Sequence, residues 1–327
     1  MNGTAPARPT ATAKRRALRE LLARDEVTVM PGGFGPLYAR MAQEAGFESF
    51  FVAGSQLAAF LYGYPDVGVL GLRDVVDHVR HVASATDIPI MVDGDTGYGN
   101  AVNVTFAVRE LVRSGVAAVQ IEDQEAPKKS GTVSGRRLIS RDEAVGKYRA
   151  AVLARDELDP EFVVCARCDA IGAEGGTFAD AVDRCVAYVE EGGADFVWLN
   201  TVQSREQLAE ACARIPAPVL AIWGGPDPAP TLAEYARLGV RIVLHPVVAA
   251  RAGAQAAWEL LHELRRDGPP ALDRWRERIA AGPWGPVPDK ALLGTDRLRD
   301  LEELVLPAAL RRDYETTFGH RTMEGQS

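Results

Sequence analysis

The sequence predicts an α/β fold, a (β/α)8 TIM-type barrel with a C-terminal helical extension. Short apolar runs alternate with amphipathic helical patterns, and eight such runs occur between Val27 and Leu244. The runs are continuously apolar, as expected for parallel strands that are buried on both faces. Eight such repeats favour a closed barrel over an open doubly wound sheet. A dinucleotide-binding sheet is further disfavoured because no GxGxxG motif follows the first apolar run.

Strands and helices are predicted to alternate after a first helix at residues 14–24. The predicted strands are residues 27–31, 49–53, 88–92, 117–121, 162–166, 196–199, 219–222 and 241–244. The predicted helices that follow them in turn are residues 35–42, 72–85, 101–114, 141–158, 178–191, 204–214, 231–238 and 253–266. This order gives one helix after every strand, which is the repeating unit of the barrel.

The two ends of the chain are predicted to lie outside the barrel. Residues 1–16 are rich in Ala, Thr, Pro and Arg without the apolar segment of a signal peptide, so we expect a disordered leader. Residues 17–252 form the predicted catalytic barrel. Residues 253–327 add the last of these helices, a Pro-rich linker at 282–288, a helix at 296–304 and a polar tail. We expect this extension to pack on the barrel or on a neighbouring subunit.

Composition and charge indicate a cytoplasmic enzyme. Hydrophobic residues make up 47% and charged residues 25% of the 327 positions, which is ordinary for a globular protein. The net charge of −8 argues against a nucleic-acid partner. No apolar run reaches the roughly 18–20 residues that a membrane span needs, so no membrane is expected. The four cysteines fit a reducing compartment, and the pair Cys165 and Cys168 lies in a strand pattern without further ligands.

Acidic side chains follow the third and fourth predicted strands. Asp93 and Asp95 end the third strand, and Glu122 ends the fourth. The C-terminal strand ends form the active-site face of a barrel, so these carboxylates should converge and require a cation. Oxygen ligands without His or Cys favour Mg²⁺, with Mn²⁺ possible. The alternative is that one of these acids caps the following helix.

Basic residues near the same face predict a small anionic substrate. Residues 127–137 are basic and glycine-punctuated, which is typical of a lid that closes over an anion. Arg167 emerges from the fifth predicted strand, and a buried arginine needs an anionic partner such as a substrate carboxylate or phosphonate. An internal ion pair with Asp169 or Glu122 is the alternative.

Several ordered motifs resemble those of the isocitrate lyase/phosphoenolpyruvate mutase superfamily. The resemblance runs from about Val27 through the C-terminal helices. The motifs are Gly54-Ser55, Pro65-Asp66-x-Gly68, Asp93-x-Asp95-x-Gly97-Tyr98-Gly99, Glu122-Asp123-Gln124, Pro127-Lys128-Lys129, Gly135-Arg136-Arg137-Leu138-Ile139-Ser140 and Ala166-Arg167-x-Asp169-Ala170. Each motif alone is modest, but their order and spacing together are specific.

The resemblance implies a metal near Asp93, with Asp95, Glu122 and Asp66 around it through water. It implies that the 2-oxo acid carboxylate is held by Gly54, Ser55 and Arg167. Mg²⁺ would polarise the oxo group and stabilise an enolate. It also implies a homotetramer with an exchanged C-terminal helix; the residues alone leave a homodimer equally open.

Three positions depart from the lyase pattern. Ser130 stands in the lid where lyases carry a catalytic cysteine, and a hydroxyl is a weaker proton carrier. Asn200 replaces a glutamate after the sixth strand. Ile222 and Trp223 replace polar residues that hold a second carboxylate, which predicts a more apolar distal pocket. The lid also lacks the Lys-x-Asn/Thr-Ser-Leu pattern of the phosphonate branch.

These residues together predict a Mg²⁺-dependent lyase that forms or cleaves a carbon–carbon bond through an enolate. The substrate would be a 2-oxo acid or a substituted malate or isocitrate. Lys128, Ser130, Arg167 and Asp66 are the predicted catalytic residues, and Asn200 and Trp223 join the substrate-binding set. The alternatives are phosphoenolpyruvate mutase or phosphonopyruvate hydrolase chemistry on a phosphorus–carbon bond, oxaloacetate decarboxylation, and a non-catalytic protein that binds an oxo acid.

Overall fold

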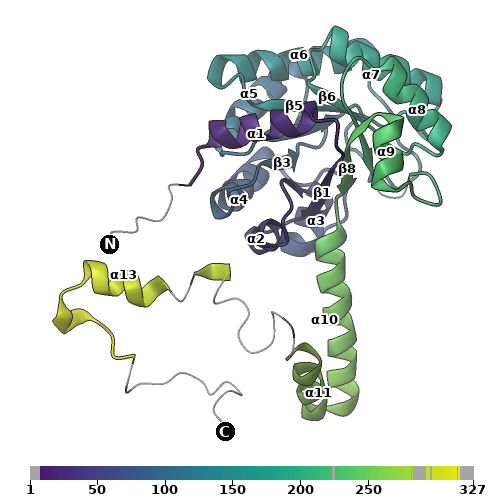
Figure 1. Ribbon diagram of the computed structural model, residues 1–327. Helices are drawn as coiled ribbons and strands as arrows, with labels where there is room; N and C mark the ends of the chain where they lie inside the picture. The colour runs from purple at the N-terminus through teal and green to yellow at the C-terminus, as the bar shows by residue number, and fades with distance from the viewer. Residues whose placement is uncertain are drawn as a thin grey trace. The chain divides into compact units, whose positions relative to one another are not determined.

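Eight parallel strands close into a barrel in sequence order, and β1 pairs with β8 (Figure 1). The computed structural model describes residues 8–222, 225–280, 282, 292–294, 297–314 and 316. The strands are β1 (Thr28–Gly33), β2 (Phe50–Val52), β3 (Ile90–Asp93), β4 (Ala118–Glu122), β5 (Val163–Cys168), β6 (Phe196–Leu199), β7 (Val219–Ile222) and β8 (Val240–His245). The predicted (β/α)8 fold class is therefore confirmed.

Helices follow the strands around the outside of the barrel. They are α2 (Pro36–Glu44), α3 (Gly54–Leu57) with the π-helix η1 (Ala58–Tyr62), α4 (Leu72–Ala85), α5 (Ala101–Arg113), α6 (Arg141–Leu158), α7 (Phe178–Glu190), α8 (Arg205–Arg214) and α9 (Leu232–Leu238). Five of them begin after a side chain that accepts a hydrogen bond from the first turn, which satisfies backbone donors at the helix start. These capping residues are Asn100, Ser140, Thr177, Ser204 and Thr231.

Strand register brings two predicted site residues and Trp198 into one row. Glu122 of β4 pairs with Arg167 of β5, and Arg167 pairs with Trp198 of β6. Side chains directly opposite each other on neighbouring strands project to the same face of a sheet. All three are buried. The row therefore places the carboxylate, the guanidinium and the indole side by side inside the barrel.

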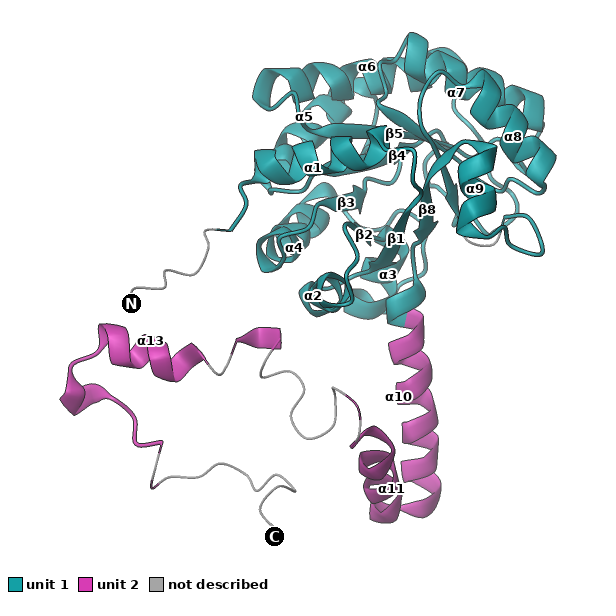
Figure 2. Cartoon of the chain, in the orientation of Figure 1, with its two compact units in different colours: residues 1–250 teal, residues 251–327 magenta. Residues whose placement is uncertain are grey.

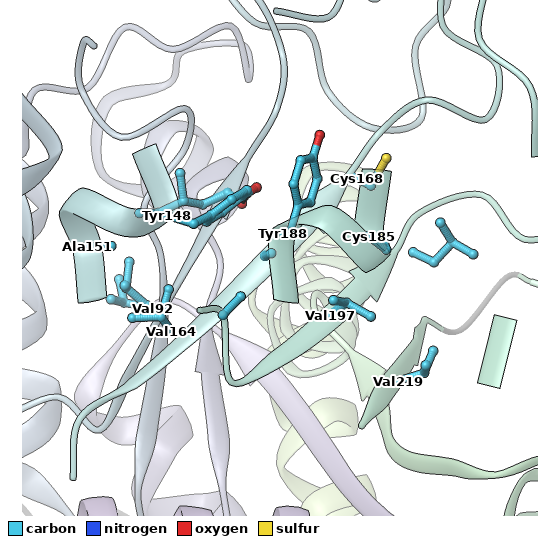
Figure 3. Packing of buried hydrophobic residues seen from close by; sticks show 14 of the residues in the cluster. Val92, Tyr148, Ala151, Val164, Cys168, Cys185, Tyr188, Val197 and Val219 are labelled. Atoms are coloured by element: carbon cyan, nitrogen blue, oxygen red, sulfur yellow. Dashed lines mark hydrogen bonds between the residues drawn. The ribbon is translucent and has the colours of Figure 1, made fainter. Parts of the chain in front are cut away.

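Two hydrophobic clusters hold the barrel together. One fills the barrel interior, and the other lies between the strands and the surrounding helices. In the outer cluster, Tyr148 of α6 and Tyr188 of α7 pack with ring centroids 4.7 Å apart, beside Val164 and Val197 (Figure 3). The Tyr188 hydroxyl donates to a carboxylate oxygen of Asp123 at 2.7 Å. The outer helices are thus tied to the strand ends by polar as well as apolar contacts.

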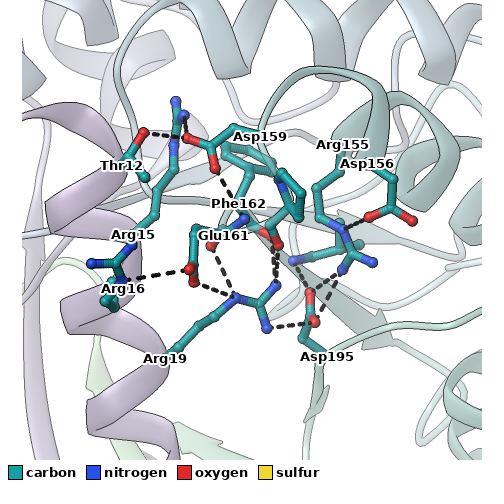
Figure 4. Close-up of polar contacts among 12 residues, drawn as sticks. Thr12, Arg15, Arg16, Arg19, Arg155, Asp156, Asp159, Glu161, Phe162 and Asp195 are labelled. Atoms are coloured by element: carbon teal, nitrogen blue, oxygen red, sulfur yellow. Dashed lines mark hydrogen bonds and ion pairs between the residues drawn. The ribbon is translucent and has the colours of Figure 1, made fainter.

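Helix α1 (Ala11–Ala23) corrects the predicted leader at residues 1–16, because its first turns lie within that segment. Lys14 donates to the carbonyls of Ala83 and Thr86, and Arg15 donates to two further carbonyls and pairs with Asp159 at 2.5 Å. Figure 4 shows the Arg15–Asp159 contact next to those of Arg16 and Arg19. The helix predicted at residues 14–24 is confirmed, and it begins three residues earlier, at Ala11.

We expect Arg15→Ala to lower the free energy of unfolding by about 2–3 kcal/mol, because Asp159 loses a buried charged partner. The loss stays moderate since Asp159 keeps hydrogen bonds from Thr12 and from the backbone of Glu161. Urea unfolding followed by circular dichroism measures the change. Arg16→Ala is the matched control, because 61% of that side chain is exposed and its loss should cost under about 0.5 kcal/mol. Equal effects of the two substitutions would contradict the assignment.

The chain divides into two units, residues 1–250 and 251–327 (Figure 2). The division lies two residues before the predicted boundary. The helices after the barrel are α10 (Val248–Asp267), α11 (Pro269–Ile279), α13 (Arg297–Val305) and the 3-10 turn η2 (Ala308–Leu310). Helix α11 was not predicted, and most of the predicted linker at 282–288 lies outside the described residues. None of the described helices is long and apolar enough to cross a bilayer.

The second unit exposes a large share of its apolar side chains. Trp258 and Leu261 of α10 are 63% and 62% exposed, and Leu304 of α13 is 82% exposed. Others in this unit are Leu264, Leu293, Leu298, Leu301, Val305 and Leu310. Apolar groups gathered on so small a unit are typical of surfaces that another chain covers.

Candidate active site

The predicted metal-site acids lie at the C-terminal ends of neighbouring strands. Asp93 ends β3, Asp95 follows it, and Glu122 ends β4; all three are buried. One Asp93 oxygen accepts from the backbone N–H of Gly54 and the other from that of Asp95, each at 3.1 Å. A non-glycine residue seldom adopts the φ of 46° found at Asp95. The loop after β3 is therefore held in an unusual conformation around Asp93.

Gly54 lies directly against the two aspartates. A Cβ atom at Gly54 would lie 3.1 Å from Oδ2 of Asp93 and 3.5 Å from Oδ1 of Asp95. The two carboxylates therefore face one small region that a larger residue would fill. Ser55, predicted with Gly54 to bind substrate, is half-buried beside it in α3.

Lys128 reaches from the segment after β4 into this group of acids. Its ammonium lies 2.8 Å from Oδ1 of Asp95 and also pairs with Asp66, and the residue is only 4% exposed. Burial raises the pKa of Asp95 to about 6; Lys128 opposes this shift and Asp93 adds to it. Burial alone would lower the pKa of Lys128, but the surrounding carboxylates raise it above its ordinary value. Lys128 is thus a charged partner of Asp66 and Asp95.

Arg167 makes the internal ion pairs that were the alternative to substrate binding. Its guanidinium forms ion pairs with Glu122 at 3.1 Å and with Oδ2 of Asp169 at 2.9 Å, and it donates a hydrogen bond to Oδ1 of Asp169 at 3.0 Å. The same group stacks 4.4 Å above the ring of Trp198. Neither Glu122 oxygen accepts a hydrogen bond within the described residues, and burial raises the pKa of that carboxyl. Arg167 is therefore fixed in place, and any substrate role must use its remaining donor directions.

The predicted lid lies against the barrel. The side-chain amide of Gln124 holds the start of the lid in place. It donates a hydrogen bond to the carbonyl of Lys129 and accepts one from the backbone N–H of Lys129, both at 3.0 Å. The hydroxyls of Ser130 and Thr132 lie 3.2 Å apart. Asn200, after β6, lies 3.4 Å from the carbonyl of Gly131. The structure brings Asn200 to the lid, whereas the Ser130 hydroxyl contacts Thr132 and none of the acids among the described residues.

A cavity of about 600 Å³ opens beside Asp95 and Lys128. Its walls include Val69, Tyr98 and Phe106. The Tyr98 hydroxyl is buried without a hydrogen-bond partner among the described residues, and burial raises its pKa. The cavity is large enough for a small organic anion and combines apolar walls with a charged end.

The donor set fits a Mg²⁺ ion held by one or two carboxylates and by water. Within the described ranges, no three acidic, His or Cys side chains converge closely enough to enclose a metal by themselves. Mg²⁺ in proteins usually takes one or two carboxylates and keeps several waters. Asp93 and Asp95 face one region, and the unbonded oxygens of Glu122 lie in the neighbouring strand end. Asp93 and Asp95 would hold the ion, with Glu122 and Asp66 acting through water.

Two members of this site were not among the predicted site residues. They are Asp169 and Arg136. Asp169 contacts Arg167, Asn200 and Arg136. Arg136 is only 4% exposed, although it belongs to the basic lid segment. The motif Gly135-Arg136-Arg137 was visible in the sequence, but nothing in it distinguishes the buried arginine from the exposed one. Trp223, predicted to line the pocket, lies outside the described residues.

Comparison with known proteins agrees with this geometry. The family described as phosphoenolpyruvate phosphomutase matches residues 18–265. The 2-methylisocitrate lyase of Aeropyrum pernix is 38% identical over 253 residues, which cover 77% of this chain and 80% of that protein. The crystal structure of a 2,3-dimethylmalate lyase superposes with a TM-score of 0.80 at 30% identity, over 94% of this chain and all of the other.

A second similar structure contains a metal ion. Phosphonopyruvate hydrolase in complex with oxalate and Mg²⁺ superposes with a TM-score of 0.76 at 32% identity, covering 90% of this chain and 99% of that one. The family match spans most of the chain, and the acids, lid and barrel described above lie within it. The chain therefore belongs to the isocitrate lyase/phosphoenolpyruvate mutase superfamily.

Proposed function

We propose that this protein is a Mg²⁺-dependent carbon–carbon lyase that acts on a 2-oxo acid or a substituted malate. This proposal rests on the excess of negative charge at the mouth of the barrel. Among the described residues there, five carboxylates meet three cationic side chains, so a divalent cation would neutralise the site. The acids are Asp66, Asp93, Asp95, Glu122 and Asp169, and the cations are Lys128, Arg136 and Arg167.

Each residue has a role that follows from its contacts. When bound, Mg²⁺ supplies Lewis-acid stabilisation for the negative charge that develops on the oxo group. Gly54 and Ser55 would border the substrate carboxylate, with the free donor directions of Arg167 facing it. The Oγ of Ser130 is the proton carrier that the lid offers, while Lys128 remains charged between Asp66 and Asp95. Lid closure would exclude water from the reacting carbon.

The substrate class is proposed from the relatives and from one position. Their names describe lyases of methyl-substituted isocitrate and malate. Ile222, at the end of β7, is partly buried and packs against the barrel-interior cluster. We propose that the distal part of the substrate is alkyl-substituted. Phosphorus–carbon chemistry is the second candidate, because phosphonopyruvate hydrolase has the same fold at a similar identity.

A turnover screen by NMR tests the proposal. The panel contains 2,3-dimethylmalate, 2-methylisocitrate, oxaloacetate, phosphonopyruvate and phosphoenolpyruvate, each with Mg²⁺ and with EDTA. We expect Mg²⁺-dependent release of an oxo acid from a carbon–carbon substrate. Release of phosphate, or rearrangement of a phosphonate, would assign the second candidate instead. Oxalate binding without turnover of any compound would favour a non-catalytic binding protein.

The affinity for Mg²⁺ should fall as the pH decreases through about 6. Protonation of Asp95, whose pKa is raised to about 6, removes a carboxylate that the ion needs. Below that pKa the apparent dissociation constant should rise about tenfold per pH unit. Calorimetric titration with MgCl₂ between pH 5 and 8 measures the effect, and Asp95→Asn is the control that should flatten it. A wild-type affinity independent of pH would contradict Asp95 as a ligand.

We propose that the protein is a cytoplasmic homo-oligomer, a tetramer or dimer, assembled through the second unit. The exposed apolar side chains of α10 and α13 support this, since their burial would contribute about 25 cal/mol per Å². Light scattering after gel filtration should give a mass above the 35.2 kDa of one chain. Trp258→Glu combined with Leu261→Glu should lower that mass. A monomeric wild-type protein would rule the assembly out.

A further inference from the structure

Arg136 and Arg137 are adjacent in the lid segment but have opposite surroundings. The side chain of Arg137 is 66% exposed and pairs with Glu174 at 2.9 Å. The side chain of Arg136 is 4% exposed. A buried guanidinium is costly unless its donors find acceptors, so the contacts of Arg136 indicate what it is for.

Arg136 joins the lid to the segment after β5. One terminal nitrogen donates to the carbonyl of Gly131 and lies 3.6 Å from Oδ1 of Asp169. The other donates to the carbonyl of Ile171 at 2.8 Å. The two terminal nitrogens of the guanidinium therefore join the lid backbone to the segment that follows Arg167, while Nε has no hydrogen-bond partner among the described residues.

Asn200 makes a parallel connection. Its amide nitrogen lies 2.5 Å from Oδ1 of Asp169 and 3.4 Å from the carbonyl of Gly131. Asp169 in turn accepts a hydrogen bond from the guanidinium of Arg167 at Oδ1 and forms an ion pair with it at Oδ2. Arg136 and Asn200 thus both connect the Gly131 carbonyl of the lid to the carboxylate of Asp169.

The lid residue at this junction has no room for a side chain. A Cβ atom at Gly131 would lie 2.3 Å from Nη2 of Arg167 and 2.8 Å from Nδ2 of Asn200. Neither group can move freely, since both are bonded to Asp169. Gly131 of the lid therefore lies against the Arg167 guanidinium, and any residue with a Cβ atom at this position would collide with it.

We propose that Arg136 is a positioning residue that couples closure of the lid to the orientation of Arg167. It acts through Gly131 and Asp169 and does not touch the substrate. When the lid seats, Arg136 and Asn200 bridge it to Asp169, which fixes the guanidinium that borders the reacting region. The effect on catalysis rests on the proposed function, whereas the effect on the lid does not.

Hydrogen exchange measured by mass spectrometry tests the lid directly, without substrate. The amides of Lys129 and Val133 are hydrogen-bonded when the lid is seated. Arg136→Gln should increase exchange in peptides covering residues 127–135 at least tenfold. Arg137→Gln removes the same charge from the neighbouring exposed position and should leave exchange unchanged. Equal protection in wild type and Arg136→Gln would overturn the proposal.

A second variant approaches the same contact from the lid. Gly131→Ala keeps Arg136 but should show the same rise in exchange, and Ser134→Ala, at an exposed position of the loop, is its control. This pair decides the question if Arg136→Gln does not fold. Normal protection of the lid in Gly131→Ala would also overturn the proposal.

Oxalate with Mg²⁺ is the probe for Arg167. By calorimetry, Arg136→Gln should bind oxalate at least tenfold more weakly, and Arg137→Gln within about twofold of wild type. Wild-type strength in Arg136→Gln would show that Arg167 is oriented without Arg136 and would overturn the coupling. If wild type itself binds no oxalate, the proposed function fails, and the exchange data alone decide the role of Arg136 in the lid.

Discussion

Asp93→Asn should lower kcat/KM by about a thousandfold, equivalent to about 4 kcal/mol of transition-state stabilisation. Asp93 would bind the metal directly, and its two oxygens also accept from the backbones of Gly54 and Asp95. An asparagine keeps only one acceptor, so one of these N–H groups would face an NH₂ group. The substitution therefore weakens both the metal site and the loop that shapes it.

Two measurements separate these consequences for Asp93→Asn. Mn²⁺ binding followed by electron paramagnetic resonance reports metal affinity, and circular dichroism reports folding. We expect Mn²⁺ affinity to fall while the fold is retained. Asp77→Asn is the control, since this carboxylate on α4 is 53% exposed and outside the site. Undiminished Mg²⁺-dependent turnover in Asp93→Asn would refute the metal site.

Lys128→Met should reduce activity about a hundredfold or more and lower the free energy of unfolding by about 3–5 kcal/mol at pH 8. The side chain keeps its length, but Asp66 and Asp95 lose their buried cation. Lys128 lowers the pKa of Asp95, so its removal raises that pKa further above 6. The folded state then holds this proton more tightly than the unfolded state, and stability increases as the pH falls.

The pH dependence identifies the cause of the Lys128→Met effect. Urea unfolding should show a smaller deficit at pH 5 than at pH 8. The double substitution Lys128→Met with Asp95→Asn should recover part of the stability without recovering activity. Lys129→Met is the matched control, because the neighbouring lysine is exposed and should tolerate the change. A deficit that does not change with pH would point to lost packing in place of lost charge pairing.

The barrel could be predicted from the sequence because its strands are contiguous apolar runs. The predicted strands at 196–199 and 219–222 coincide with β6 and β7. The prediction placed the first helix at residues 14–24 and missed the first three residues of α1, a helix that Lys14 and Arg15 tie to the barrel. Their acceptors, among them Asp159, lie far along the chain. Hydrogen bonds and ion pairs between residues far apart in the chain leave no local sequence pattern from which they could be predicted.

The acidic residues of the candidate site could be predicted from the sequence, but the ion pairs that they form could not. Asp93, Asp95 and Glu122 follow strands, and strand ends of a barrel meet at one face. The pairing of Lys128 with Asp66 depends on two loops that approach only after folding. The lid charges were therefore predicted to face the substrate, whereas Lys128 is bonded to carboxylates of the protein itself.

The placement of the cysteines determines how the protein responds to thiol-reactive chemicals. Cys165, Cys168 and Cys185 are buried, and burial raises the pKa of the partly exposed Cys212 to about 11. The lid carries Ser130 at the position where the lyase pattern noted in the sequence has a catalytic cysteine. Alkylating agents and peroxide react with accessible thiolates, which this chain does not present. The reaction would therefore persist under oxidative conditions that inactivate enzymes of this fold with a thiol in the lid.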